Sequence, residues 1–580
     1  MHTFRVWAPT RCRVDVIAGE RRLSMEQGER GWWEISDGGA RAGTRYGYSL
    51  DGGAVRPDPR SPSQPDGVLG LSEVIDHDAY AWNDGAWRGM PLAGSVLYEL
   101  HVGTFSPKGT LDGVIERLPH LVELGIDAIE LMPVAEFSGH RGWGYDGVDL
   151  FAPHHAYGGP AALRRLVDAC HSRGLGVVLD VVYNHLGPVG NFLSEFGPYF
   201  NDRHQTDWGA PFNFDGAESD EVRRFVVDNA LMWIRDYHVD GLRLDAVHAI
   251  VDQTPLNILE QLAQEVEALG AELGRSIFII AESDLNDPRL VRSRDAGGHG
   301  LDAAWSDDWH HALHAAITGE RTGYYEDFGS LELLGKALRQ AWVYDGVWST
   351  HRQKMRGRKA SGLPSHSFVI ASQNHDQVGN RAAGDRLSAL VDEGVLKVAA
   401  ALLLTAPFTP MLFQGEEWAS SSPFQYFTDH ADPELGRAVG EGRRTEFAAF
   451  GWDPDLVPDP QSPSTFDRSK LAWGEVDEPF HRRILEWYRD LIRLRRALPI
   501  PRDGAGEGIR VLVDDDKRRL VFERDSISVR VNLGESDWHS LISAGNRLLL
   551  ASDPAITPGD DSICLPPSSV VILEVPTAGD

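Results

Sequence analysis

The chain has 580 residues, more than one hydrophobic core can support, so we expect two or three domains. Hydrophobic residues make up 42% and charged residues 24% of the chain, as in ordinary globular proteins, and no apolar run is long enough to cross a membrane. The formal net charge of −30, from 56 basic and 86 acidic residues, opposes binding to nucleic acid and to anionic membrane surfaces, so a neutral binding partner is expected.

The first 90 residues consist of short segments of strand character broken by turn residues. These segments are FRVWAP (4–9), RVDVIAG (13–19), GWWEISDG (31–38) and TRYGYSLDG (44–52). They predict an N-terminal β-sandwich over residues 1–90. The proline-rich segment RPDPRSPSQPDG within this range predicts a loop or linker.

From Ser95 the pattern changes to short runs rich in Val, Ile and Leu, mostly separated by helical patterns. The eight runs are SVLYELHVGTF (95–105), IDAIELMPV (126–134), LGVVLDVVYNH (175–185), GLRLDAVH (241–248), SIFIIAES (276–283), LDAAWS (301–306), SFVIASQNHD (367–376) and TPMLFQGEE (409–417). Buried runs alternating with helices favour parallel strands and predict a (β/α)₈ TIM barrel over residues 91–498, enlarged by loop insertions. A doubly wound parallel sheet is the structural alternative.

Helical periodicity marks four of the connections between these runs, at residues 111–125, 162–174, 221–238 and 256–270. After residue 498 the chain returns to short strand-like segments. They are IRVLVDD (509–515), RLVFERD (519–525), ISVRVNL (527–533), NRLLLAS (546–552) and SVVILEV (569–575). These segments predict a C-terminal β-sandwich over residues 499–580.

Cysteine usage and the start of the chain bear on the cell compartment. The three cysteines, Cys12, Cys170 and Cys564, lie far apart and match neither a C-x-x-C site nor a disulfide framework, so we expect free thiols. The opening MHTFRVWAPT lacks the profile of a secretion signal. Both features favour a cytoplasmic location.

Polar residues gather at the ends of four predicted barrel strands, the side on which such barrels carry their chemistry. They are Asn184, His185, Arg243, Asp245, Glu282, His375 and Asp376. Because alternate residues of a strand share a face, Arg243 and Asp245 taken alone are explained by a structural ion pair. Four apolar strands that all end in ionisable groups are not explained by packing and indicate one shared catalytic site.

The segments DVVYNH, GLRLDAVH, IIAES and QNHD, in this order, resemble the four sequence regions of the α-amylase family of glycoside hydrolases and transferases. FRVWAP is similar to the immunoglobulin-like, carbohydrate-binding sandwich that precedes the barrel in branching and debranching enzymes of that family. The resemblance implies Asp245 as nucleophile, Glu282 as acid/base and Asp376 as a third carboxylate that holds sugar hydroxyls. This trio suits hydrolysis with retention, which needs one nucleophilic carboxylate and one proton-donating carboxylic acid.

Other residues of the same segments are expected to bind the sugar or support the trio. Arg243 places a fixed positive charge beside Asp245 and stabilises its anion. By resemblance, His185 and His375 contact the sugar and Tyr145, in GWGYDGVDLF, stacks on it; a core tyrosine is the alternative. Asn184 resembles an asparagine of the calcium site in many α-amylases, but no acidic cluster completes such a site, so we expect no metal and no cofactor.

Departures from the α-amylase pattern concern specificity. α-Amylases usually carry Lys-His three and four residues after the nucleophile, where this chain has His248 and Ala249. LRLDAVHAI, QNHDQVGNRAAGDR and FQGEEWASSSPFQYFTDH together most resemble the maltooligosyltrehalose trehalohydrolase family. That resemblance implies cleavage of the α-1,4-glucosidic bond next to the terminal trehalose unit of a malto-oligosaccharide, with release of trehalose in trehalose biosynthesis.

Several residues are candidates for recognising the trehalose unit. They are His248, Asn374, Gln377, Trp309, His310 and His311, the last three in SDDWHHALH. The alternative for SDDWHHALH is the start of a surface helix capped by Asp307 or Asp308.

Two other functions remain open from the sequence. A glycogen branching or debranching enzyme would fit the N-terminal domain, and a non-catalytic carbohydrate-binding protein would fit a barrel that has lost activity. The intact trio argues against the latter. The expected partner is a malto-oligosaccharide with a terminal trehalose, with functional coupling to a maltooligosyltrehalose synthase.

Overall fold

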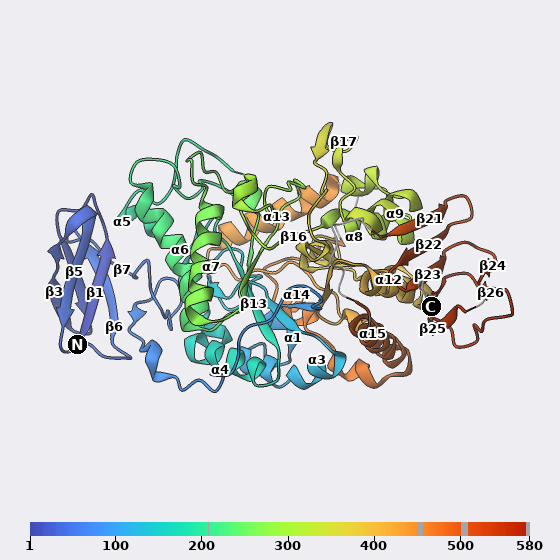
Figure 1. The fold of residues 1–580 in the computed structure, drawn as a ribbon. Coiled ribbons are helices and arrows are strands. Elements are labelled where there is room, and N and C mark those ends of the chain that lie inside the picture. Colours follow the sequence, from blue (N-terminus) through green and yellow to red (C-terminus); the bar gives the residue numbers. More distant parts are fainter. Residues whose placement is uncertain (207, 450–455, 500–507, 544, 576–580) are drawn as a thin grey trace.

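Eight parallel strands close into a barrel at the centre of the molecule (Figure 1). This computed structural model describes residues 1–206, 208–449, 456–499, 508–543 and 545–575. The barrel strands, in chain order, are β9 (Leu97–Leu100), β10 (Ala128–Leu131), β13 (Gly176–Val181), β14 (Gly241–Leu244), β15 (Phe278–Ala281), β16 (Ala303–Trp305), β19 (Phe368–Ala371) and β20 (Thr409–Phe413). Each lies inside one of the eight predicted runs. The predicted TIM barrel is therefore confirmed, and the doubly wound sheet is excluded because β20 pairs with β9.

Helices surround the barrel and pack apolar faces against it. They include α4 (Gly159–His171), α6 (Ser219–Asp236), α7 (Ile258–Leu273), α8 (Asp307–Thr318), α12 (Glu393–Thr405) and α15 (Pro479–Ala497). The helix predicted over 111–125 is two helices, α2 (Leu111–Ile115) and α3 (Leu118–Leu124). Pro119 accounts for the break, because proline lacks the amide hydrogen that a continuous helix would use and is tolerated only in a first turn.

Two small sheets form the N-terminal region, at the blue end of the ribbon (Figure 1). One contains β1 (His2–Trp7), β5 (Trp32–Asp37) and β4 (Glu26–Gln27). The other contains β3 (Arg21–Ser24), β2 (Val14–Ala18), β6 (Arg45–Leu50), β7 (Val55–Arg56) and β8 (Ser72–Glu73). Phe4, Val16 and Tyr48 are buried, as expected for inward-facing residues of a sandwich.

The C-terminal region lies at the opposite end of the molecule (Figure 1). Its larger sheet has the order β21 (Arg510–Asp514), β22 (Arg519–Arg524), β23 (Ile527–Asn532), β27 (Ser569–Glu574), β25 (Arg547–Ala551). A second, two-stranded sheet pairs β24 (Trp538–Leu541) with β26 (Ser562–Leu565). All five predicted strands are present.

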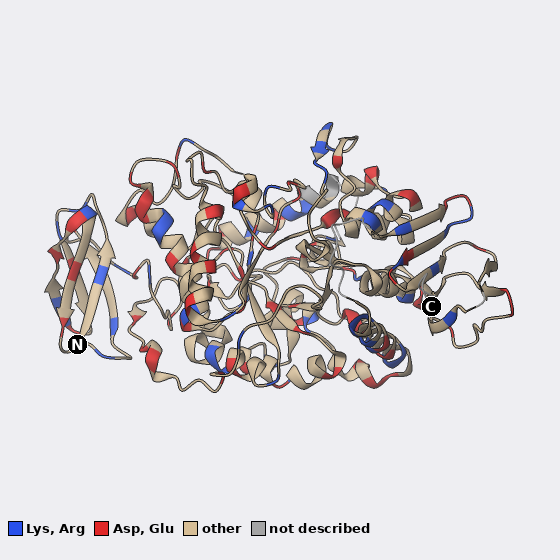
Figure 2. Ribbon diagram, in the orientation of Figure 1, with Lys and Arg blue, Asp and Glu red and all other residues tan. Residues whose placement is uncertain are grey.

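Charged residues of both signs are interspersed over the barrel helices and both terminal regions (Figure 2). Across the described ranges, no helix combines the length and the apolar character needed to cross a membrane.

Candidate active site

A cavity of about 570 Å³ opens at the carboxyl ends of the barrel strands. Its wall includes many of the residues predicted from the sequence, namely Tyr145, His185, Asp245, His248, Glu282, His375 and Asp376. Asp245 directly follows β14 and Glu282 directly follows β15, so two adjacent parallel strands deliver the two carboxyl groups to the same rim.

Asp245 is held by two hydrogen bonds, one to each carboxylate oxygen. Arg243 Nη1 donates to Oδ1 at 2.9 Å, and Asn184 Nδ2 donates to Oδ2 at 3.0 Å. Its side chain is 14% exposed, so a face remains open to the cavity. The arrangement fixes the carboxylate in one orientation and stabilises its anionic form.

Unlike Asp245, Glu282 lies in surroundings that disfavour the ionised carboxylate. Burial raises the pKa of Glu282 well above its ordinary value; Arg243 opposes this shift and the neighbouring Asp245 adds to it. The backbone amide of Ala246 donates to Oε2 at 2.6 Å, and Ala246 adopts the left-handed conformation (φ 40°) that aims this amide at the carboxyl group. The pair thus sets a carboxylate that accepts two hydrogen bonds, Asp245, beside a buried carboxyl group, Glu282, whose raised pKa favours the protonated form.

Arg243 lies fully buried behind the two carboxyl groups. Its Nη1 atom also donates to Asp180 at 2.8 and 2.9 Å, and its guanidinium carbon lies 4.1 Å from the centroid of the Trp305 ring. Burial raises the pKa of Asp180 to about 6 although Arg243 opposes the shift. Asp180 was missed in the sequence, where it stands at the start of DVVYNH and carries its own signal, an acidic residue in an apolar strand.

A chain of hydrogen bonds continues from Asp180 across the barrel. Tyr145 donates to Asp180 Oδ2 at 2.6 Å, and its hydroxyl oxygen lies 2.9 Å from His375 Nε2. Glu99, on β9, accepts from the backbone amide and the Nδ1 atom of His375, at 3.0 and 2.5 Å. Burial alone would lower the pKa of His375, but Asp376 and Glu99 raise it to about 9. Glu99 was also missed, although SVLYELHVGTF shows it as an acidic residue inside an apolar run.

Asp376 is the most exposed carboxylate of the trio, with 46% of its side chain accessible. His375 Nε2 lies 3.4 Å from its Oδ2 atom, and Asn380 Nδ2 donates to Oδ1 at 3.2 Å. The exposure leaves this carboxylate free to accept hydrogen bonds from a ligand in the cavity.

The wall of the cavity also includes Trp208, a residue that the sequence interpretation missed. Its ring is 47% exposed, stacks on His185 at a centroid distance of 6.0 Å, and meets His248 edge to face at 6.2 Å. His185 Nδ1 lies 2.6 Å from Oδ1 of Asn184. The same asparagine donates to Asp245, so the histidine ring is held close to that carboxylate. An exposed indole at a polar cavity is the usual platform for the apolar face of a sugar ring.

Five predicted contacts do not line the cavity: Asn374, Gln377, Trp309, His310 and His311. Trp309 is fully buried and packs edge to face against Phe408. His310 Nδ1 donates to the carbonyl of Ser372 at 2.6 Å, and His311 packs against Tyr324 at 4.8 Å.

The segment around these three residues is helical, as the alternative interpretation held, since α8 begins at Asp307. The helix is largely buried, however, and its N-cap residue is Ser306, which makes no side-chain cap hydrogen bond. Asp308 instead accepts from the backbone amides of Val343 and Tyr344, at 2.6 and 2.7 Å.

Asn374 and Gln377 lie at the start of α10 (His375–Gly379). Asn374 Oδ1 accepts from the amides of Asp376 and Gln377, at 3.0 and 3.1 Å, so its side chain is the N-cap of this helix. Gln377 Nε2 donates to Asp307 at 3.4 Å. Asn374 thus positions Asp376 from behind the cavity wall, whereas the Gln377 side chain contacts Asp307.

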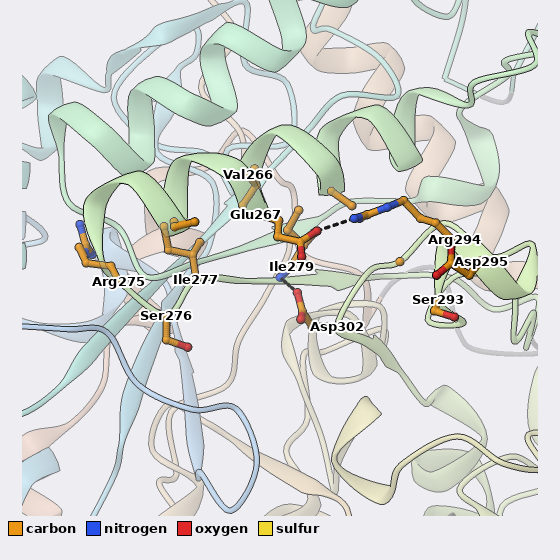
Figure 3. Close-up of a pocket in the computed structure, with 14 residues that line it drawn as sticks. Val266, Glu267, Arg275, Ser276, Ile277, Ile279, Ser293, Arg294, Asp295 and Asp302 are labelled. Carbon is orange, nitrogen blue, oxygen red and sulfur yellow. Dashed lines mark hydrogen bonds and ion pairs between the residues drawn. The ribbon is translucent and has the colours of Figure 1, made fainter.

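A second cavity, of about 460 Å³, lies between α7 and the segment around β15 and β16 (Figure 3). Arg294 in its wall pairs with Glu267 at 2.5 Å, and Asp302 accepts from the amide of Ile279 at 2.7 Å (Figure 3). It contains none of the predicted site residues. Residues from its wall precede β15, so it lies toward the amino ends of the strands, away from the active-site cavity.

Comparisons with known proteins agree with this geometry. The family model "Alpha amylase, catalytic domain" matches residues 63–216. A crystal structure named as an alpha amylase from Salmonella typhimurium is 38% identical and superposes with a TM-score of 0.91, over 99% of this chain and 97% of that one. A pullulanase from Paenibacillus barengoltzii, 19% identical, shares the fold with a TM-score of 0.74, over 99% of this chain and 93% of that one.

Relatives found by sequence identify the family more narrowly than the solved structures do. The malto-oligosyltrehalose trehalohydrolase of Arthrobacter ramosus is 53% identical over 91% of this chain and 92% of its own length. The enzyme of the same name from Rhizobium sp. (strain M-11) is 50% identical over 98% of this chain and 97% of its own length. Another, from Mycobacterium tuberculosis (strain ATCC 25618 / H37Rv), is 46% identical over 99% of both chains. This chain belongs to the malto-oligosyltrehalose trehalohydrolase family, within the α-amylase superfamily of barrels.

Proposed function

We propose that the protein is a retaining glycoside hydrolase that cleaves the α-1,4-glucosidic bond next to the terminal trehalose of maltooligosyltrehalose. The products are trehalose and a malto-oligosaccharide. The observation that supports the chemistry is the pairing of a hydrogen-bonded Asp245 anion with a buried Glu282 of raised pKa in one cavity. The near full-length relatives named as trehalohydrolases support the substrate.

In the first step Asp245 attacks the anomeric carbon of the glucose on the non-trehalose side. Glu282 gives its proton to the glycosidic oxygen as the bond to trehalose breaks, so trehalose leaves with a new hydroxyl group. The sugar remains as an ester on Asp245, and Glu282 is left as a carboxylate.

In the second step the ionised Glu282 takes a proton from water, and the water oxygen attacks the anomeric carbon. The ester bond to Asp245 breaks, which restores both carboxyl groups and releases the malto-oligosaccharide with its original anomeric configuration.

The surrounding residues position the sugar and the trio. Protonated His375 donates to Tyr145, which in turn donates to Asp180, so the wall under the reacting sugar is rigid and carries fixed polarity. Asp376 accepts hydrogen bonds from sugar hydroxyls. Arg243 acts from behind the wall through Asp245, which it holds and stabilises as an anion.

We place the trehalose unit beside Trp208, His185 and His248, which form one aromatic and imidazole rim of the cavity. The indole stacks on a glucose ring, and His248 supplies a polar contact where α-amylases carry a lysine. Asn374 acts indirectly in this proposal, because its side chain fixes Asp376 through the cap of α10.

Product analysis tests the function. The enzyme is incubated in separate reactions with maltopentaosyl-trehalose, with maltoheptaose and with amylopectin, and the sugars are identified by chromatography. We expect rapid release of free trehalose from the first substrate and slow release of maltose from the second. New or lost α-1,6 branches in amylopectin would instead identify a branching or debranching enzyme, and no product from any substrate would identify a non-catalytic binding protein.

The supply of this substrate requires an enzyme that converts the reducing end of a malto-oligosaccharide into a trehalose unit. We therefore propose functional coupling to a maltooligosyltrehalose synthase in the cytoplasm. The absence of an ionic charge on the substrate agrees with the strongly negative chain, which would repel an anionic one.

A further inference from the structure

A second cluster of titratable side chains lies outside the cavity wall. Glu136 ends the short strand β11 (Ala135–Glu136), and His154 and His155 follow the strand that pairs antiparallel with it, β12 (Asp149–Pro153). The three side chains therefore meet where the segment between the two strands begins and ends.

The possible ligand atoms of the cluster lie close to one another. One nitrogen of each histidine and one oxygen of Glu136 all lie within 4.8 Å of one another. His154 Nδ1 lies 3.3 Å, and His155 Nδ1 lies 2.7 Å, from Glu136 Oε1. Ligand atoms on a tetrahedral zinc ion, with bonds of about 2.0–2.1 Å, are about 3.3 Å apart. The first spacing already fits, and the second requires a movement of the partly exposed His155.

His154 supplies a second observation that points to a cation. Its side chain is fully buried; Nδ1 has only the 3.3 Å contact with Glu136, and Nε2 has no hydrogen-bond partner among the described residues. The ring is stacked on Phe137 at a centroid distance of 3.7 Å and an angle of 17°, so it cannot easily rotate toward solvent. A buried nitrogen without a hydrogen bond destabilises the folded chain, and a bound cation would remove that cost by taking up the nitrogen lone pair.

The donor set of the cluster suits a divalent cation. Two imidazoles and one carboxylate form a donor set that zinc prefers, with a fourth position left for water. The His155 side chain is 20% exposed, so the cluster is in contact with solvent on that side.

We propose that Glu136, His154 and His155 bind a divalent transition-metal ion of the zinc type. The ion ties together the two ends of the segment 137–153, which carries Tyr145 into the active-site wall, and so acts as a structural clip. The inference does not depend on the proposed substrate, since none of the three ligands lines the cavity. Binding displaces protons from the histidines, so affinity should fall as the pH is lowered.

Metal content and thermal stability test the site. The protein is stripped with a chelator, dialysed against Zn²⁺ and then against metal-free buffer, and analysed by inductively coupled plasma mass spectrometry and differential scanning calorimetry. We expect one Zn²⁺ per chain and a Tm that rises with Zn²⁺. His155→Ala and Glu136→Gln should retain less than a tenth of an equivalent and show no Zn²⁺-dependent rise in Tm. His539→Ala, at an exposed histidine of the C-terminal sheet, is the matched control and should bind as the wild type does.

Two results would overturn the assignment. One is wild-type protein that binds no Zn²⁺ under these conditions. The other is stoichiometric binding that survives in His155→Ala, which would place the ion elsewhere on the surface. His155→Ala decides the question even if Glu136→Gln fails to fold, because His155 is partly exposed while Glu136 is fully buried.

Discussion

Glu99 and His375 lie 276 positions apart in the chain and are joined by two hydrogen bonds, through the backbone amide and the Nδ1 atom of the histidine. The contact links the first barrel strand to the end of the seventh. Burial alone would lower the pKa of His375, but Asp376 and the buried Glu99 together raise it to about 9, which favours the protonated ring at neutral pH.

Glu99→Gln should therefore change the pH dependence of catalysis. Loss of the carboxylate lowers the pKa of His375, so the protonated form needed to donate to Tyr145 is lost at a lower pH. We expect the alkaline limb of kcat/KM against pH to move to lower pH, and kcat/KM at neutral pH to fall by roughly ten-fold or more. Glu34→Gln, at an exposed residue of β5, is the matched control. An unchanged alkaline limb would show that His375 does not control the profile.

Asp245→Ala should abolish the chemical step. Without the nucleophile, kcat should fall by several orders of magnitude while the protein remains folded, because Arg243 keeps its ion pair with Asp180. Single-turnover kinetics and circular dichroism measure the two effects. A variant with substantial activity would exclude Asp245 as the nucleophile.

Glu282→Gln removes the proton donor but keeps the shape of the side chain. The loss of kcat/KM should be large for natural substrates and much smaller for glycosyl fluorides or activated aryl glycosides, whose leaving groups need little protonation. The ratio between the two substrate types is measured for variant and wild type. Equal losses on both would assign Glu282 a binding role.

Trp208→Ala removes the exposed ring from the cavity rim. Loss of one stacking contact should reduce kcat/KM for the trehalose-ended substrate by roughly ten-fold, and by less for maltoheptaose. Trp348→Ala, at an exposed tryptophan that is not part of the cavity wall, should leave the ratio between the substrates unchanged.

His248→Ala should lower the same ratio, since a lost hydrogen bond to a bound ligand costs about 0.5–1.5 kcal/mol. If Trp208→Ala and His248→Ala both kept the wild-type ratio, the trehalose unit would have to bind elsewhere on the wall.

His171 provides a prediction about stability. It is fully buried in α4 and lies between Asp84 and Asp240, at 2.8 and 2.9 Å. Burial alone would lower the pKa of His171, but the hydrogen bonds to Asp240 and Asp84 raise it, while the pKa values of both aspartates are lowered. Removing one member of such a buried ionic network costs about 3–5 kcal/mol, so His171→Ala should lower the free energy of unfolding by that order.

These pKa shifts determine at which pH the His171 network stabilises the protein. Stabilisation by His171 is complete below its ordinary pKa of about 6.5 and is lost as the pH rises through the raised folded value. Stabilisation by the aspartates is present above about pH 3.9 and is lost as the pH falls through their lowered folded values. Urea denaturation of wild type and His171→Ala should therefore differ most between about pH 4 and 6.5. A difference that grows above this range would contradict the charged network.

Short-range patterns in the sequence were sufficient to predict the barrel strands and to place ionisable residues at their ends. Runs of buried aliphatic residues predicted all eight barrel strands, because a strand covered on both faces must be apolar throughout. Asp245 and Glu282 were identified because an ionisable group at the end of such a run is costly without a function. These signals are local, so they survive in a single sequence.

Only the tertiary structure decided which side chains meet. It brought Glu99 to His375 and Asp180 to Arg243, contacts between strands that no spacing along the chain encodes. It exposed Trp208 at the cavity and buried Trp309 in the core, although both are tryptophans beside polar residues in the sequence. The exposure of a side chain depends on what the rest of the chain packs against it. That information is distributed over the whole barrel and is absent from any single segment.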